Sequence, residues 1–150
     1  MIRLPHAHLF YARHQPKDAR QSLLLIHGAG GSHLSWPAEL RRLPQTAVYA
    51  LDLAGHGRSH LPGRSTIEAY TQDVLDFIDA LKLENVVVLG HSMGGAIAQM
   101  VGLAHSAKVT GLVLVATGAR LRVSPNILAA IQDDYEAAVE LLNHFYWGGS

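Results

Sequence analysis

Apolar runs and helical patterns alternate along most of the chain. Four runs are almost continuously apolar, as in strands covered on both faces: residues 22–28, 46–53, 85–90 and 109–117. A shorter stretch at residues 8–13 predicts one more strand. Because strands joined by helices tend to pair in parallel with helices on both faces, this order predicts an α/β fold with a doubly wound, mostly parallel sheet.

Two of the connecting segments have helical signatures with expected caps. Residues 65–83 repeat apolar positions every three or four residues, and Ser65 and Glu68 have the spacing of a capping box. The acidic residues of this helix are expected to face solvent: Asp73, Asp76 and Asp79. Residues 35–43, "SWPAELRRL", predict a shorter helix whose N-terminus is capped by Ser35.

Composition and charge argue against several classes of protein. The 150 residues include 12 basic and 12 acidic side chains, and this balance predicts neither a nucleic-acid partner nor a membrane-surface partner. The chain contains no cysteine, which leaves no disulfide and no thiolate metal site and fits a reducing compartment. No apolar run reaches the roughly 20 residues of a membrane helix, and the N-terminus lacks a secretory apolar region. We therefore expect a cytoplasmic protein without a metal or a cofactor.

One serine stands between paired glycines at the end of a predicted strand. In "VVVLGHSMGGAIAQM", Ser92 has Gly90 two residues before it and Gly94 two residues after it, and a predicted helix begins at Met93. A strand that turns directly into a helix tolerates only small neighbours, and it lifts the serine hydroxyl to the carboxyl edge of the sheet. The positive end of the helix dipole points to the same place. The pattern predicts Ser92 as an exposed nucleophile; the alternative is a serine that only caps the helix.

A serine nucleophile needs hydrogen-bond donors for the oxyanion that its attack creates. One predicted donor is the backbone N–H of Met93, which directly follows Ser92. The other is expected in the loop "HGAGGS", where we place it at the N–H of Ala29, with Gly30 as the second choice. A phosphate-binding role of this loop is disfavoured, because it has neither the G-x-G-x-x-G spacing nor the P-loop lysine.

Four motifs together carry a resemblance to a known family. The segments "HGAGGS", "DLAGHGRS", "GHSMGGAIAQ" and "LVLVATGAR" stand in the order and spacing of α/β-hydrolases, and the chain from Leu9 to about Arg120 resembles the N-terminal half of such a protein. The resemblance implies a serine hydrolase for an ester or related small acyl substrate, with Ser92 as nucleophile and Ala29 and Met93 as oxyanion donors. It leaves ester, lactone, C–C and perhydrolysis chemistry open. Members with an aspartate nucleophile are disfavoured, because position 92 holds serine.

The other members of the expected triad are missing from the sequence. In α/β-hydrolases an acid and then a histidine follow the serine. The resemblance therefore implies a chain truncated after the sixth family strand, with residues 1–120 as core and residues 121–150 as the helical start of the cap. A C-terminal half or a complementing chain is expected to supply the rest. A short triad from the tail is disfavoured, because its members lie in helical patterns: Asp133, Asp134 or Glu136 with His144.

The remaining polar residues have structural roles in this interpretation. His27 and His56 are expected to brace loops, and His91 is expected to pack against its surroundings. Asp52 and Arg58 are expected to hold "DLAGHGRS" together through hydrogen bonds. Surface positions are expected for the other histidines: His6, His8, His14, His33, His60 and His105. Two functions of other classes remain open, namely a non-catalytic protein of this fold that binds a small ligand, and an inactive fragment.

Overall fold

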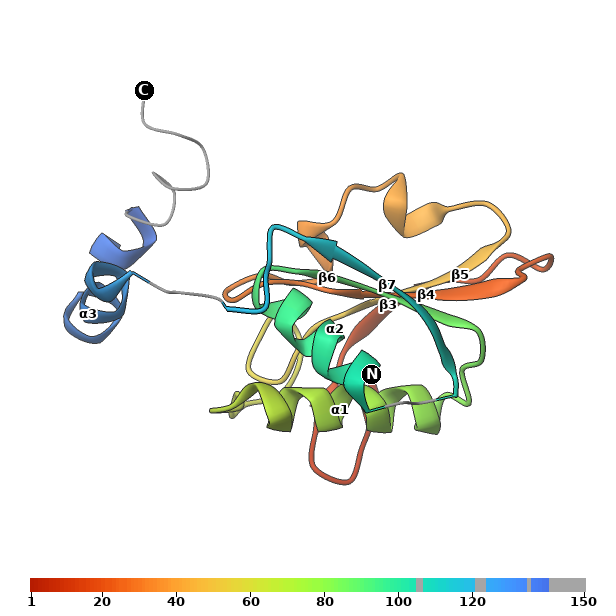
Figure 1. Cartoon of the computed structure of the whole chain (residues 1–150), viewed down its shortest axis with the longest axis horizontal. Helices are drawn as coiled ribbons and strands as arrows, with labels where there is room; N and C mark the ends of the chain where they lie inside the picture. Colours follow the sequence, from red (N-terminus) through yellow and green to blue (C-terminus); the bar gives the residue numbers. More distant parts are fainter. Residues whose placement is uncertain (105–106, 121–123, 135, 141–150) are drawn as a thin grey trace. The chain divides into compact units, whose positions relative to one another are not determined.

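The computed structural model describes residues 1–104, 107–120, 124–134 and 136–140. The chain divides into two compact units, Met1–Ala119 and Arg120–Ser150 (Figure 1). In the second unit the structure describes helix α3, Pro125–Asp133, and a helical stretch at residues 136–140. Within the described ranges no helix is both long enough and apolar enough to cross a lipid bilayer.

A five-stranded sheet forms the centre of the first unit. Its order is β3 (Tyr11–His14), β5 (Thr46–Leu51), β4 (Gln21–Ile26), β6 (Val86–His91) and β7 (Val109–Val115). Strand β3 runs antiparallel to β5, and the other neighbouring pairs are parallel. The predicted α/β fold with a mostly parallel sheet is therefore confirmed.

The predicted strand at residues 8–13 is divided into two. Strand β2 (His8–Leu9) pairs with β1 (Ile2–Arg3) in a short hairpin, and β3 joins the main sheet. Phe10 lies between them, and its N–H donates to the side chain of Ser59 at 2.8 Å instead of to a neighbouring strand. A side-chain acceptor from a distant loop therefore interrupts what the local pattern predicts as one strand.

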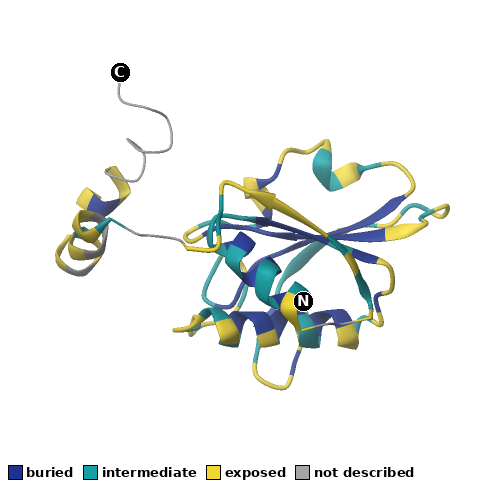
Figure 2. Ribbon diagram, viewed as in Figure 1, coloured by how far each residue is buried: buried dark blue, intermediate teal, exposed yellow. Residues whose placement is uncertain are grey.

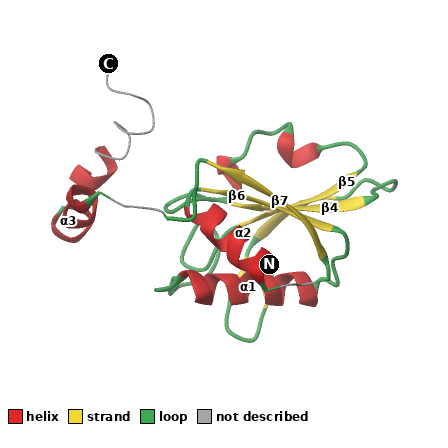
Figure 3. Ribbon diagram, in the orientation of Figure 1, coloured by secondary structure: helices red, strands yellow, loops and turns green. Residues whose placement is uncertain are grey.

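Alternate side chains of the strands build an apolar core on each face of the sheet. On one face, Leu24 and Ile26 pack in a core with α1 (Ile67–Ala80) and α2 (Met93–Leu103). The other face, with Leu23 and Leu25, is covered by a segment that contains two 3₁₀ helices. These are η1 (His33–Ser35) and η2 (Leu40–Arg42). Figures 2 and 3 show the buried strands between the two layers, which explains why β4 is apolar at four successive positions, from Leu23 to Ile26.

The prediction of one helix at residues 35–43 is wrong. Trp36 ends η1 in an extended conformation, with φ −97° and ψ 139°. Pro37 explains this break, because a proline disfavours the helical conformation of the residue before it. The N-cap is Ser32, whose side chain accepts a first-turn N–H at 3.2 Å, and Ser35 instead accepts the N–H of Ser32 at 3.0 Å.

Helix α1 is present as predicted, with two corrections. Thr66 and not Ser65 is the N-cap, and its side chain accepts the N–H of Ala69 at 3.2 Å. Asp73 is buried instead of facing solvent, and its carboxylate accepts two hydrogen bonds from Arg64, at 2.8 Å and 2.7 Å. Bidentate pairing of this kind compensates the loss of hydration that a buried carboxylate suffers.

Strand β7 is more exposed than its sequence predicts. Its last four side chains are 39% to 46% exposed: Leu112, Val113, Leu114 and Val115. Among the strands that the structure describes, β7 lies at the edge of the sheet next to β6. An edge strand with exposed apolar side chains is a surface that another strand or chain can cover.

Candidate active site

Ser92 is the single residue that connects strand β6 to helix α2. Strand β6 ends at His91 and α2 begins at Met93, so the whole change of direction falls on one residue. Ser92 has φ 52° and ψ −117°, which is an unfavourable conformation for a residue with a side chain. Such a conformation costs on the order of 1–3 kcal/mol and persists only where the surroundings hold it in place.

The side chain of Ser92 does not cap the helix that follows it. Ser92 is the N-cap residue of α2 by position, but its hydroxyl makes no capping hydrogen bond. The helix is instead bonded through the Ser92 carbonyl, which accepts the N–H groups of Gly95 at 2.9 Å and Ala96 at 3.3 Å. The hydroxyl is therefore not used by the helix, which argues against the capping alternative.

The two glycines that flank Ser92 occupy positions without room for a side chain. A Cβ atom added to Gly90 would lie 2.2 Å from the carbonyl oxygen of Gly94. A Cβ atom on Gly94 would lie 2.1 Å from the carbonyl oxygen of Ile26, the last residue of β4. The backbone before Ser92 therefore lies directly against the backbone after it, and the first turn of α2 lies directly against the end of β4.

The loop "HGAGGS" approaches Ser92 from the end of β4. A Cβ atom on Gly28 would lie 3.2 Å from the Cβ atom of Ser92 and 3.0 Å from Nδ1 of His91. Gly30, the second-choice donor, has φ 71° and open space around its Cα atom, because an added Cβ atom would meet nothing within 4 Å. Met93 lies in the first turn of α2, where backbone N–H groups have no partner within the helix. The structure thus brings the Gly28–Ala29 segment, Ser92 and Met93 to the same edge of the sheet.

His27 holds the loop "HGAGGS" in place through hydrogen bonds of its buried ring. Its side chain is fully buried, Nδ1 lies 2.7 Å from the carbonyl oxygen of Gly28, and Nε2 accepts the N–H of Leu53 at 3.0 Å. Burial lowers the pKa of His27 from 6.5 to about 4, so the ring is neutral at pH 7 and donates through Nδ1–H. Gly31 donates its N–H to the same Gly28 carbonyl at 3.1 Å. The prediction that His27 braces a loop is confirmed by these bonds.

This buried histidine makes a specific prediction about acid stability. The lowered pKa means that the contribution of neutral His27 is complete above about pH 6.5 and is lost as the pH falls toward about 4. Between about pH 7.5 and about pH 5, we expect His27 to account for a loss of roughly 2 kcal/mol in the free energy of unfolding. Urea unfolding at several pH values should give a flatter pH profile for His27→Asn, while the exposed His6→Asn keeps the wild-type slope. Parallel profiles for wild type and His27→Asn would contradict the prediction.

Asp52 organises the loop that follows β5, and the structure corrects the position of His33. Asp52 is fully buried, and its carboxylate accepts the backbone N–H of Arg58 at 2.9 Å. The same carboxylate lies 2.9 Å and 3.0 Å from Nδ1 of His33, which is buried and not at the surface as predicted. Ser59 donates its hydroxyl to the Asp52 carbonyl at 2.6 Å. Asp52 therefore binds loop backbone and a histidine, as expected for a residue that holds "DLAGHGRS" together.

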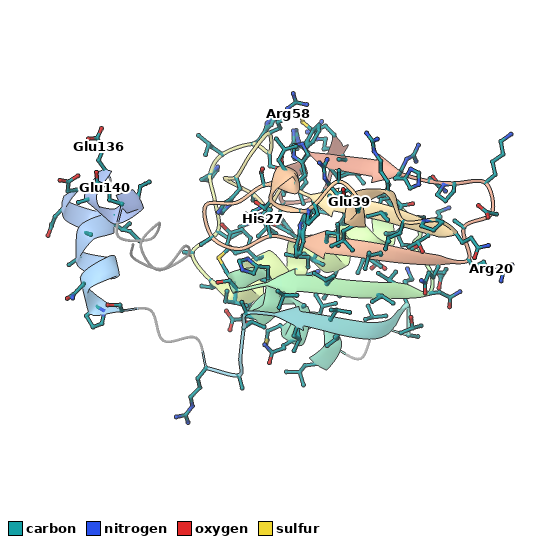
Figure 4. All side chains as sticks on the ribbon, turned by 90° about the horizontal axis from the view of Figure 1, so that it is seen from above. Arg20, His27, Glu39, Arg58, Glu136 and Glu140 are labelled. Atoms are coloured by element: carbon teal, nitrogen blue, oxygen red, sulfur yellow. The ribbon has the colours of Figure 1, made fainter. Side chains whose placement is uncertain are left out.

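Arg58 and His27 differ in their surroundings. Figure 4 shows His27 among the strands and Arg58 at the outside of the first unit. The guanidinium group of Arg58 lies over the ring of Phe10, 5.1 Å from its centre, while its backbone binds Asp52. Arg58 thus stabilises the loop through its backbone N–H, and its guanidinium group makes a cation–π contact with Phe10.

The remaining predictions concern other histidines and the C-terminal tail. His56 braces its own loop, because its Nδ1 lies 3.0 Å from the carbonyl oxygen of Ala54. His91 packs edge-on against the ring of Trp36, with ring centres 6.5 Å apart. His105 and His144 lie outside the described residues, and the acidic residues of the disfavoured short triad belong to the second unit. Within the described part of the chain, no three His, Asp or Glu side chains are grouped to hold a metal ion.

One residue at this site was not found from the sequence. Thr117, just after β7, donates its hydroxyl to the Ser92 carbonyl at 2.9 Å. The two residues are 25 positions apart, and no spacing rule links a threonine after one strand to a serine after another. Only the neighbouring register of β6 and β7, which pairs His91 with Val115, brings them together.

The chain is similar in sequence to proteins of one known family. A model of the alpha/beta hydrolase family matches residues 23–149. An uncharacterized protein of Mycobacterium tuberculosis is 35% identical over 99 residues, which cover 65% of this chain and 29% of that protein. The pimeloyl-[acyl-carrier protein] methyl ester esterase of Photorhabdus laumondii is 31% identical over 123 residues, which cover 79% of this chain and 46% of the esterase.

A solved structure agrees with these relatives. The esterase of a marine microorganism superposes with a TM-score of 0.70 at 32% identity, over 85% of this chain and 51% of the esterase. The chain thus spans about half, or less, of the length of the proteins it matches. The glycine-flanked corner at Ser92, the parallel sheet and the match over residues 23–149 lead to one conclusion: the chain belongs to the alpha/beta hydrolase family.

Proposed function

We propose that the protein is a serine hydrolase that cleaves an ester or related acyl bond, with Ser92 as its nucleophile. The observation that carries the proposal is the conformation of Ser92, with φ 52°, between β6 and α2 and with its hydroxyl unused by the helix. Strained backbone conformations cluster at active sites, and here the strain presents one hydroxyl at the carboxyl edge of a parallel sheet. Esterases among the similar proteins support the same class of reaction.

The reaction follows from the groups around Ser92. A base removes the proton of the Ser92 hydroxyl as its oxygen attacks the substrate carbonyl, and a tetrahedral oxyanion forms. The N–H of Met93 and the N–H of Ala29, or of Gly30 in its place, stabilise this oxyanion. Each such donor is worth about 10² to 10³ in kcat. The oxyanion then collapses, the bond between the acyl carbon and the alcohol oxygen breaks, and the protonated base gives its proton to the leaving alcohol. In the second half the base removes a proton from water as the water attacks the acyl-enzyme, and that proton passes to the Ser92 oxygen when the acid is released.

The base and its acid belong, in this proposal, to residues outside the present sequence. His27 is unsuited to the role, because it is buried, neutral and bonded at both ring nitrogens. A C-terminal half or a complementing chain supplies the catalytic histidine and acid, and residues 121–150 are assigned to the start of the cap region. The substrate is a small acyl compound, and the lack of cysteine fits a cytoplasmic enzyme.

A serine-directed fluorophosphonate probe tests the proposal. In the full-length protein we expect covalent modification at Ser92, located by peptide mass spectrometry and absent from Ser92→Ala. Residues 1–150 alone should react much more slowly, because a serine without a positioned base is a weak nucleophile. Ligand binding without modification of Ser92 would favour the non-catalytic alternative. Rapid ester hydrolysis by residues 1–150 alone would place the base inside this chain and return attention to His144.

A further inference from the structure

The last residue of β7 and the segment just after it hold Ser92 at both of its backbone polar groups. The N–H of Ser92 donates to the carbonyl oxygen of Val115 at 3.0 Å. The carbonyl of Ser92 accepts the hydroxyl of Thr117 at 2.9 Å. Ala116, between them, has φ 47°, a left-handed conformation that turns the chain after the strand. Two residues of one segment thus bind both ends of the strained residue.

Thr117 reaches Ser92 only because residue 95 is glycine. A Cβ atom on Gly95 would lie 2.4 Å from Cγ2 and 2.7 Å from Oγ1 of Thr117. Gly95 is not one of the two glycines that the turn at Ser92 itself requires. Gln99, one turn later in α2, lies with its amide nitrogen 3.2 Å from the Gly95 carbonyl and 3.4 Å from the Gly118 carbonyl. The start of α2 and the segment after β7 are therefore fitted to each other around the Ser92 carbonyl.

The hydrogen bond from Thr117 to the Ser92 carbonyl also affects the N–H of Met93. The carbonyl of Ser92 and the N–H of Met93 belong to the same peptide group, which is planar, with these two groups pointing in opposite directions. The N–H groups of Gly95 and Ala96 bind this carbonyl from within the helix, and the Thr117 hydroxyl adds a donor from outside the helix. Donors that fix the Ser92 carbonyl also fix the direction of the Met93 N–H. A hydrogen bond to the carbonyl also polarises the amide and strengthens its N–H as a donor.

The other proposed oxyanion donor has a support of the same design. His27 Nδ1–H donates to the Gly28 carbonyl at 2.7 Å, and that carbonyl shares its peptide group with the N–H of Ala29. Thr117 and His27 follow different strands, β7 and β4, and have different side chains. Each one nonetheless donates a hydrogen bond to the carbonyl of a peptide group whose N–H, on the opposite side, is assigned to the oxyanion.

We propose that Thr117 is a positioning residue that aims the Met93 N–H, as His27 aims the Ala29 N–H. The catalytic consequence rests on the function proposed above, and the structural consequence does not. Thr117 touches no reacting atom in this assignment. Its loss should weaken binding of the oxyanion while leaving binding of the uncharged substrate almost unchanged, because the donor is needed most when negative charge develops.

The test compares Thr117→Val with Thr117→Ser in the full-length protein. Valine keeps the shape of threonine and removes the donor, whereas serine keeps the donor and removes a methyl group. We expect Thr117→Val to lower kcat for a p-nitrophenyl ester about tenfold, which corresponds to about 1.4 kcal/mol, with KM within twofold of wild type. Thr117→Ser should retain most of the wild-type kcat. Amide hydrogen exchange at Gly95, whose N–H binds the same carbonyl, should be faster in Thr117→Val.

The outcomes separate this inference from the proposed function. If Ser92→Ala is inactive while Thr117→Val keeps wild-type kcat, the role of Thr117 is wrong and the nucleophile assignment stands. Equal losses of kcat in both Thr117 variants, together with lower Tm, indicate a packing role and also overturn the inference. If Ser92→Ala remains active, the nucleophile assignment fails, and the catalytic role of Thr117 fails with it. Should Thr117→Val not fold, Thr117→Ala replaces it in the comparison with Thr117→Ser.

Discussion

Ester hydrolysis by the full-length protein should fall by roughly 10⁴-fold or more when Ser92 is replaced by alanine. The replacement removes the attacking oxygen, and no other described group takes its place in the proposed mechanism. The fold should remain, because the Ser92 hydroxyl makes no capping hydrogen bond and the backbone bonds of residue 92 do not depend on its side chain. Steady-state kinetics and a thermal unfolding curve measure both effects on the same preparation.

Ser65→Ala is the matched control for the loss of a serine hydroxyl. Ser65 is exposed and is not the cap of α1, so Ser65→Ala should leave both kcat/KM and Tm at wild-type values. Residual activity in Ser92→Ala is expected from the oxyanion donors and from binding alone. Turnover close to wild type in Ser92→Ala, with the protein folded, would show that another residue is the nucleophile.

Replacement of Gly94 by valine should remove both soluble protein and activity. The Cβ atom would lie 2.1 Å from the carbonyl oxygen of Ile26 and 2.5 Å from that of His27, far inside van der Waals contact. Both neighbours are backbone atoms at the end of β4, so relief requires α2 to move away from the sheet. That movement would displace Ser92 and the loop at Gly28 together. We expect little soluble protein, and a large fall of Tm in whatever is recovered.

Gly111, a glycine in the sheet, provides the control for the β-branched substitution of Gly94 in α2. A Cβ atom on Gly111, in β7, would meet its nearest neighbour, Val87, at an ordinary 3.7 Å. Gly111→Val should therefore be soluble, and its strand position favours a β-branched residue. If Gly94→Val folds and hydrolyses esters like wild type, the close approach of α2 to β4 is not required and the steric account of the turn is wrong.

Local sequence was sufficient for the central strands, for α1 and for the turn at Ser92. Strands β4, β5 and β6 could be predicted because central parallel strands are apolar at nearly every position, and α1 because its apolar residues recur at helical spacing. The turn could be recognised because Gly90 and Gly94 lie two residues from Ser92, and two residues is the distance over which a sharp turn brings atoms together. The assignment of Ser92 as nucleophile remains a prediction.

For two buried polar side chains, a partner elsewhere in the chain decided the outcome. Asp73 has the helical position of an exposed residue but is buried, because Arg64 lies against it and pairs with both of its oxygens. His33 lies in a surface segment, yet the Asp52 carboxylate, 19 residues away, draws it inside. Burial of a charged or polar side chain depends on whether a partner compensates its lost hydration, and spacing within one segment does not contain that information.

The sequence by itself therefore determined the order of the elements and the strained turn, because both depend on residues within a few positions of one another. The tertiary structure decided what surrounds the turn. It places Gly28 against Ser92, His27 behind the Gly28 carbonyl and Thr117 behind the Ser92 carbonyl. These contacts join β4, β6 and β7, whose side-by-side order follows from strand pairing and not from order along the chain. A hydrogen bond between residues 25 positions apart exists only once that pairing has formed.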